Sequence, residues 1–167
     1  MNSVVETMDI SVMVNGRTVR RRVPVRLSLA DFLRHSAGLT GTHVGCEHGV
    51  CGACTLTVDG EIVRGCLMLA VQTDGCAVQT IEGFSESGKI RHLQDAFVGQ
   101  NGVQCGFCTP GMLIAANALL AQEPKPTRDR IREFLSGNYC RCTGYQAIVD
   151  AIEQAANAVQ PSQEGAA

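Results

Sequence analysis

The chain has 167 residues, of which 45% are hydrophobic and nine are cysteine, and its formal net charge at pH 7 is −2. This length and apolar content suffice for one mid-sized domain or two small ones without disulfides. The near-neutral charge gives no reason to expect a nucleic acid or an anionic membrane surface as partner, and no apolar run is long enough to span a bilayer. No secretory signal is visible, so we expect a cytoplasmic protein whose thiols serve metal or redox chemistry.

The first part of the chain has the alternating pattern of short β-strands. Apolar residues alternate between Met8 and Val25 around Asn15-Gly16, a dipeptide typical of tight hairpin turns. Ser28 is placed to cap a short helix over 29–35. Further strands are predicted at 55–58, 61–63 and 76–81, beyond a glycine-rich loop at 41–52. These signals predict a small mixed sheet with one helix within residues 1–82.

Beyond a linker with Gly and Ser at 83–88, the periodicity becomes helical. Thr109 (followed by Pro110), Thr127 and Thr143 are each placed to cap a helix. With an apolar face over 92–99, they predict four short helices within residues 89–159, as in a small bundle. Residues 160–167 are small and polar, and we expect a disordered tail there.

The cysteines of the first part have the spacing of a plant-type [2Fe–2S] site. They form C-x4-C-x2-C followed by a fourth cysteine after eleven residues, and they are Cys46, Cys51, Cys54 and Cys66. Glycines at 45, 49 and 52 allow the loop to fold tightly and to aim backbone N–H groups at the sulfurs. Zinc is the alternative, but zinc sites favour paired short knuckles, which this group lacks.

The second group is less specific by spacing alone. Cys105 and Cys108 form C-x2-C, and 31 residues later Cys140 and Cys142 form C-x-C, which suits zinc or iron–sulfur ligation. Each pair precedes a predicted helix, whose unpaired N–H groups favour thiolates. We therefore expect four thiolates where two helix starts meet. The ninth cysteine, Cys76, lies on a predicted strand, and we expect it to be buried as a small apolar residue.

Four segments together resemble the iron–sulfur subunit of the molybdenum hydroxylases, the superfamily of xanthine dehydrogenase, aldehyde oxidase and aerobic carbon monoxide dehydrogenase. The resemblance covers residues 8–157. The segments are Cys46-Glu-His-Gly-Val-Cys51-Gly-Ala-Cys54-Thr, Gly65-Cys66, Gln104-Cys105-Gly-Phe-Cys108-Thr-Pro-Gly111 and Gly137-Asn-Tyr-Cys140-Arg-Cys142-Thr-Gly-Tyr145. The resemblance implies an α+β fold, with an N-terminal plant-type ferredoxin-like (β-grasp) domain over 1–82 and a C-terminal four-helix-bundle [2Fe–2S] domain over 89–159.

The resemblance also implies two [2Fe–2S] clusters, one held by the first four cysteines and one by Cys105, Cys108, Cys140 and Cys142. Gln104 and Cys142 are implied to lie nearest the molybdopterin cofactor of a large partner subunit, and a medium partner subunit is implied to carry FAD. The chain then has no substrate site of its own. It is implied to be the electron-transfer subunit of a heterotrimer, which can itself dimerise, and to pass electrons from molybdenum to FAD.

Two other functions are weighed against this one. A free-standing two-cluster ferredoxin is the alternative, although mobile carriers usually concentrate charge to steer their encounters and a net charge of −2 does not do so. A zinc-bound structural module is the third. Phe107 is interpreted as a core or interface residue in preference to an electron path. These patterns do not encode the substrate of the complex.

Overall fold

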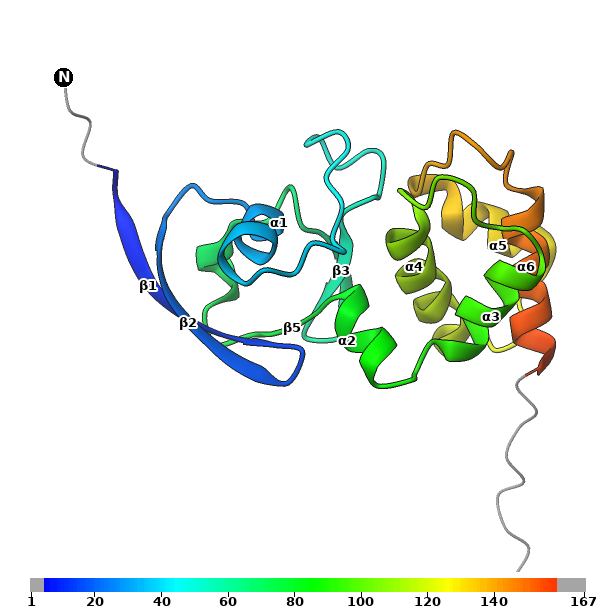
Figure 1. The fold of residues 1–167 in the computed structure, drawn as a ribbon, viewed down its shortest axis with the longest axis horizontal. Helices are drawn as coiled ribbons and strands as arrows, with labels where there is room; N and C mark the ends of the chain where they lie inside the picture. The colour runs from blue at the N-terminus through cyan, green and yellow to red at the C-terminus, as the bar shows by residue number, and fades with distance from the viewer. Residues whose placement is uncertain (1–4, 159–167) are drawn as a thin grey trace, which may run out of the picture.

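The computed structural model describes residues 5–158, which form two modules lying side by side (Figure 1). The sheet module comprises strands β1–β5 and short helices, and the helical module comprises α3–α6. Helix α2 (Ile81–Glu86) connects them. The mixed α+β class predicted from the sequence is confirmed. Among the described residues, no helix combines the length and the hydropathy needed to cross a membrane.

The sheet has five strands in the order β2-β1-β5-β3-β4. Its strands are β1 (Thr7–Val14), β2 (Arg17–Pro24), β3 (Thr55–Val58), β4 (Glu61–Arg64) and β5 (Ala77–Gln79). All neighbouring pairs are antiparallel except β1 and β5, which are parallel. The β1–β2 turn has φ 49° at Asn15 and 78° at Gly16, the left-handed pair that a type I′ turn requires. The predicted hairpin is therefore confirmed.

Short helices close the apolar face of this sheet. Helix α1 (Leu29–Asp31) begins at Ser28, whose Oγ accepts a hydrogen bond from the Asp31 N–H at 3.1 Å, and a wider helical turn continues over Phe32–Ser36. A further short turn covers Ala70–Thr73. Leu29 and Phe32 are fully buried against inward-facing strand residues, as period-2 patterning requires. This packing fixes both ends of the loop between α1 and β3.

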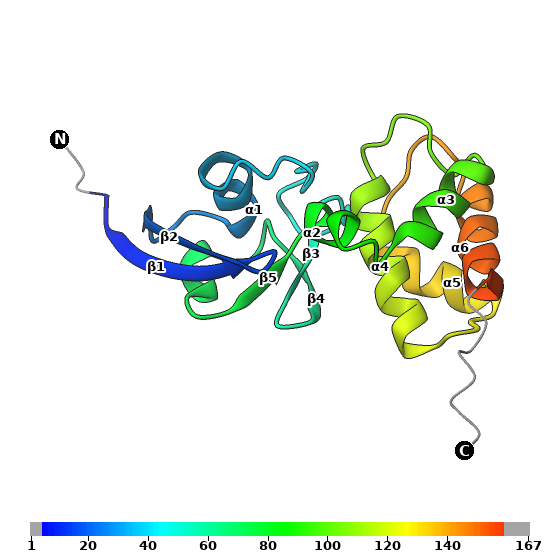
Figure 2. The same ribbon diagram turned by 60° about the horizontal axis from the view of Figure 1, so that its bottom comes forward.

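The helical module is built around one buried helix. Its members are α3 (Arg91–Gly99), α4 (Thr109–Gln122), α5 (Arg128–Phe134) and α6 (Gln146–Ala158). Residues 111–116 of α4 are all buried, because this helix lies between the sheet module and the other helices (Figure 2). A helix that is apolar all round belongs inside a protein. Helix α4 thus contributes buried residues both to the core of the helical module and to the interface between the two modules.

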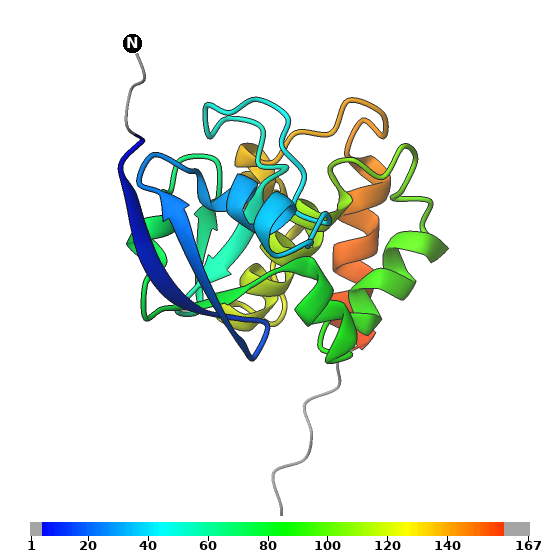
Figure 3. The same cartoon turned by 60° about the vertical axis from the view of Figure 1, so that its left-hand side comes forward.

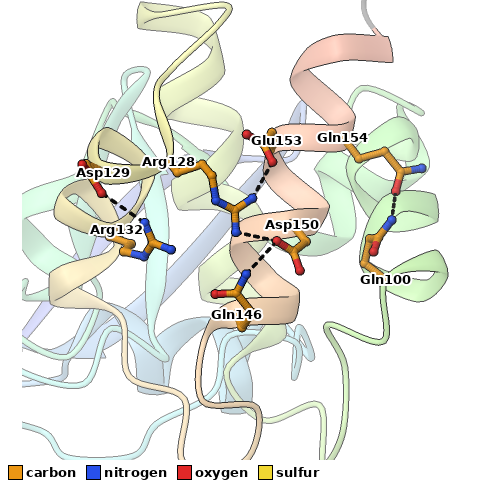
Figure 4. A network of polar contacts seen from close by, with 8 residues as sticks. All are labelled: Gln100, Arg128, Asp129, Arg132, Gln146, Asp150, Glu153 and Gln154. Carbon is orange, nitrogen blue, oxygen red and sulfur yellow. Dashed lines mark hydrogen bonds and ion pairs between the residues drawn. The ribbon is translucent and has the colours of Figure 1, made fainter.

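On the outer surface, an ion-pair network joins α5 to α6 (Figure 4). Arg128 Nη2 lies 2.6 Å from Asp150 Oδ1, and Arg128 Nη1 donates a hydrogen bond to Glu153 Oε2. The network lies within the helical module and stabilises the contact between these two helices.

Four local details differ from the sequence expectations. The strand expected at 76–81 is limited to β5 (Ala77–Gln79), and residue 81 already begins helix α2. Cys108, and not Thr109, is the N-cap of α4. Helix α6 begins at Gln146, so Thr143 does not cap it. Residues 81–86, which include the start of the expected linker at 83–88, are helical because Phe84 is buried in the core of the helical module. The tail expected at 160–167 lies outside the described residues.

Candidate iron–sulfur sites

Seven of the eight cysteines of the two motifs lie on three loops or at their edges, and these three loops project from the same side of the molecule (Figures 1 and 3). Cys66 lies on a fourth segment, between β4 and the turn at Ala70–Thr73. One loop lies between α1 and β3, in the sheet module. The other two precede α4 and α6, in the helical module. The fold therefore brings together cysteines that are far apart in sequence.

In the first site, the loop turns its backbone N–H groups toward Cys46. The N–H groups of His48 and Cys51 both donate to Cys46 Sγ at 3.4 Å. Positive φ angles at Glu47, Gly49 and Gly52 make this tight path possible. Because the two N–H groups favour the charged form, they lower the pKa of Cys46 to about 6, with that of Cys51 contributing most. The glycine-dependent loop predicted from the sequence thus presents a stabilised thiolate.

The other thiols of this group lie near Cys54, where the loop enters the sheet, and Cys66 reaches this place from the segment after β4. Cys54 is 2% exposed, and burial raises its pKa to about 11, with the neighbouring Cys66 and Cys51 adding to the effect. The Gly65 N–H donates to the Cys54 carbonyl at 3.1 Å, which places Cys66 beside Cys54. The structure therefore brings all four predicted cysteines into one group.

The second site spans two loops of the helical module. Cys142 Sγ lies 3.5 Å from Cys105 Sγ, and both residues are exposed. Cys108 lies deeper, and burial raises its pKa to about 12, helped by the adjacent Cys140 and Cys105. The four cysteines are again in one group, although Cys105 and Cys142 are 37 residues apart in the sequence.

Cys140 receives its hydrogen bonds from a turn and not from a helix start. Thr143 donates to Cys140 Sγ through its N–H at 3.4 Å and through its hydroxyl at 3.1 Å. Burial opposes ionisation of Cys140, but these bonds outweigh it and lower the pKa of the thiol. The expectation that a helix N-terminus stabilises the Cys140-Cys142 pair is wrong, because α6 begins only at Gln146.

Both sets of four thiols suit a [2Fe–2S] cluster as ligands. Each offers four thiols and at least one thiol that accepts N–H bonds, as a thiolate-bound anionic cluster requires. Over residues 5–158, no three His, Cys, Asp or Glu side chains come close enough together to hold a single metal ion. A two-iron cluster instead takes its ligands as two pairs, one on each iron, and the 3.5 Å separation of Cys105 Sγ from Cys142 Sγ is short enough for one such pair.

The two sites meet at the module interface. The Tyr139 N–H donates to the Cys51 carbonyl at 2.8 Å, which joins the residue before Cys140 to a cysteine of the first site. The ring of Phe107 stacks on His43 with centroids 4.8 Å apart, and the Phe107 carbonyl lies 2.8 Å from His43 Nδ1. Phe107 is thus an interface residue, as expected.

The remaining predicted residues lie as follows. Gln104 is exposed beside Cys105. Cys76 packs against the core of the sheet module but is only half-buried, and it precedes β5, so the expectation of a buried residue on a strand is wrong. The sequence reading missed Arg64 and Asn138, which join the two cysteine loops through side-chain hydrogen bonds. Asn138 lies within a motif of the resemblance, but no local signal reveals a partner more than 80 residues away.

Comparison with known proteins defines the class of both halves. A family model described as "2Fe-2S iron-sulfur cluster binding domain" matches residues 12–87, and one described as "[2Fe-2S] binding domain" matches residues 80–153. The chain is therefore a protein with two [2Fe–2S]-binding domains.

Relatives that match over most of their length show to which kind of [2Fe–2S] protein the chain is similar. The chain is 52% identical to the caffeine dehydrogenase subunit gamma of Pseudomonas sp. (strain CBB1), with 86% of this chain and 88% of the relative covered. It is 51% identical to the nicotine 6-hydroxylase small subunit of Paenarthrobacter nicotinovorans, with 88% of each covered. Among solved structures, quinoline 2-oxidoreductase from Pseudomonas putida 86 matches with a TM-score of 0.86 and 51% identity, over 91% of this chain and 95% of that one.

The chain belongs to the family of iron–sulfur small subunits of molybdenum hydroxylases of the xanthine dehydrogenase type. It is an electron-transfer subunit of a multi-subunit oxidoreductase, and its cofactors are two [2Fe–2S] clusters.

Proposed function

We propose that this chain carries electrons, one at a time, from a molybdopterin cofactor on a large partner subunit to FAD on a medium partner subunit. Hydroxylation of a substrate with oxygen from water releases two electrons and two protons, and the bound [2Fe–2S] clusters supply one-electron relays for the electrons. Cys46, Cys51, Cys54 and Cys66 hold the first cluster. Cys105, Cys108, Cys140 and Cys142 hold the second.

The observation that carries this proposal is the link between the two thiol groups. The Cys51 carbonyl accepts the Tyr139 N–H at 2.8 Å, and Tyr139 is bonded covalently to Cys140. The two sites are therefore separated by one hydrogen bond and one residue of backbone. A fixed relay needs such a short connection, whereas two independent structural metal sites do not.

The exposure of the second-site cysteines supports a position for each partner subunit. In the second site Cys105 and Cys142 are exposed, and Gln104 beside them is exposed as well. We propose that this edge faces the molybdopterin of the large subunit and that the sheet module faces the flavin subunit. The β-grasp and four-helix-bundle assignments, the domain limits 1–82 and 89–159, dimerisation of the heterotrimer and the cytoplasmic location remain predictions of the same proposal.

The names of the relatives with the highest identities quoted above support a class of substrate. Caffeine, nicotine and quinoline, named for three relatives at 51–52% identity, are all nitrogen heterocycles. Relatives named as aldehyde oxidoreductases are 39–42% identical. We propose a nitrogen heterocycle as the substrate of the complex.

Purification of the tagged chain from its native host tests the proposal. We expect co-purification with one molybdenum-containing and one flavin-containing subunit, and reduction of both clusters by a heterocycle from a panel of purines, pyridines and quinolines. An active monomer would instead favour the free-standing ferredoxin. Zinc in place of iron and acid-labile sulfide would favour the structural module.

A further inference from the structure

The contact between the two cysteine loops is held by a hydrogen-bond network that serves neither module alone. Asn138 precedes the second-site ligand pair in the chain and is only 3% exposed. Its amide Nδ2 donates to the Gly52 carbonyl at 3.1 Å and to Thr55 Oγ1 at 3.2 Å. Both acceptors belong to the first-site loop and its edge, so this side chain is satisfied only when the loops are docked.

Arg64 completes the network from the sheet module. Its guanidinium Nη2 donates to the Gly137 carbonyl at 2.8 Å and to Asn138 Oδ1 at 3.3 Å, while Nη1 donates to Thr55 Oγ1. The planar fork thus bridges uncharged acceptors on both modules, a geometry that a lysine ammonium cannot reproduce. Because Arg64 is the last residue of β4, its backbone is fixed by the sheet.

The network touches the chain beside ligands of both sites. Gly52 lies between Cys51 and Cys54, Thr55 follows Cys54, and Arg64 lies two residues before Cys66. Asn138 lies two residues before Cys140. Displacement of Asn138 or Arg64 therefore acts on the position of one ligand group relative to the other.

The contact between the loops is too close for any side chain at two glycine positions. A Cβ at Gly52 would lie 2.5 Å from the Gly137 carbonyl oxygen, and a Cβ at Gly111 would lie 2.3 Å from the Gly52 carbonyl oxygen. The loops therefore meet backbone to backbone, and the hydrogen bonds of Asn138 and Arg64 hold this approach closed.

We propose that Asn138 and Arg64 are positioning residues that hold the two iron–sulfur sites at a fixed separation for electron transfer between them. This role rests on the proposed function. The step that it serves moves one electron from one site to the other, and no bond forms or breaks. Neither side chain ligates metal in this proposal, and both act through the docking of the loops.

The test compares Asn138→Ala and Arg64→Gln with the matched control Arg128→Gln, in the full chain within its native complex. Arg128 also bridges two elements, α5 and α6, but it lies outside the loop contact. The first readout is the hydrogen-exchange rate of the Tyr139 N–H, which donates a hydrogen bond to the Cys51 carbonyl. The second is the rate at which an electron redistributes between the two sites after rapid partial reduction, with the electron paramagnetic resonance signal of each site as a check on its integrity.

We expect both loop variants to keep two intact signals while exchange at Tyr139 becomes about ten-fold faster, since each loses two or more hydrogen bonds of the contact. Redistribution of the electron should also become slower in both. Arg128→Gln should change neither readout. Equal behaviour of all three variants, or faster exchange with unchanged redistribution, would overturn the positioning role alone. A wild-type protein without two signals would overturn the proposed function and the positioning role together.

Discussion

Replacement of Gly111 by alanine tests whether the two modules are docked through their backbones. Gly111 lies in the first turn of α4, where alanine should stabilise the helix by about 0.5–1 kcal/mol. In this structure, however, the added Cβ would lie 2.3 Å from the Gly52 carbonyl oxygen and 3.3 Å from Asn138 Nδ2. The clash is with backbone of the other module, which cannot move aside as a flexible side chain could.

The magnitude follows from these two opposing terms. Overpacking of a closed contact costs about 1–3 kcal/mol, and the helix gain offsets about 0.5–1 kcal/mol of this, so Gly111→Ala should lower the free energy of unfolding by up to about 2.5 kcal/mol. For a chain of this size, a loss of about 1 kcal/mol corresponds to a fall of roughly 2–4 °C in Tm. Exchange of the Tyr139 N–H should also become faster, because the Cys51–Tyr139 bond depends on the same contact.

Gly99 provides the matched control. It is the last residue of α3, it is exposed, and a Cβ there would meet nothing within 4 Å. Gly99→Ala should therefore raise Tm slightly, by an amount that corresponds to about 0.5 kcal/mol. Thermal unfolding of the two cluster-loaded variants, followed by circular dichroism, measures both effects. If Gly111→Ala raised Tm as Gly99→Ala does, the close backbone contact between the modules would be refuted.

Three further predictions concern the thiol groups. Cys142→Ser should abolish one of the two paramagnetic resonance signals and about half of the bound iron; loss of both signals in a folded chain would contradict two separate sites. Thr143→Val should make the reduction potential of the second site more negative in a redox titration because Cys140 loses its hydroxyl donor, whereas Thr143→Ser should not, and equal potentials in the two variants would exclude this tuning. In the metal-free chain, iodoacetamide should label Cys46 with a half-maximal rate near pH 6, since its pKa is lowered to about 6 from an ordinary value of 9.0 and the thiolate is lost as the pH falls through that value. A midpoint near 9 would show that the His48 and Cys51 N–H groups do not act on this sulfur.

Local rules predicted the elements whose signals lie within a few residues. Asn15-Gly16 predicted the first hairpin, and Thr109-Pro110 predicted the start of α4 to within one residue. The same rules failed where the backbone leaves the helical region. Thr143 has the sequence character of a helix cap, and its hydroxyl accepts the Tyr145 N–H at 3.2 Å, but Tyr145 has a φ of 69°, so α6 begins only at Gln146.

Tertiary contacts account for the remaining differences. The expected linker is helical up to Glu86 because Phe84 is buried in the core of the helical module. Cysteine spacing predicted both thiol groups, since ligands must be close in space whatever their separation in sequence. It could not predict that Asn138 and Arg64 join these groups, because their 74-residue separation leaves no periodic or spacing signal.

The backbone contact between the cysteine loops also bears on how the two modules can be exchanged between proteins. The part of the interface between the cysteine loops consists of glycines, one amide and one guanidinium, and it asks little of the surrounding side chains. A sheet module from one relative should therefore dock onto a helical module from another, provided that the residues at positions 52, 64, 111 and 138 and the apolar residues that pack β3 and β4 against α4 are kept. Such an interface would also hold the two modules together within a longer polypeptide, because it depends on few residues outside the two loops.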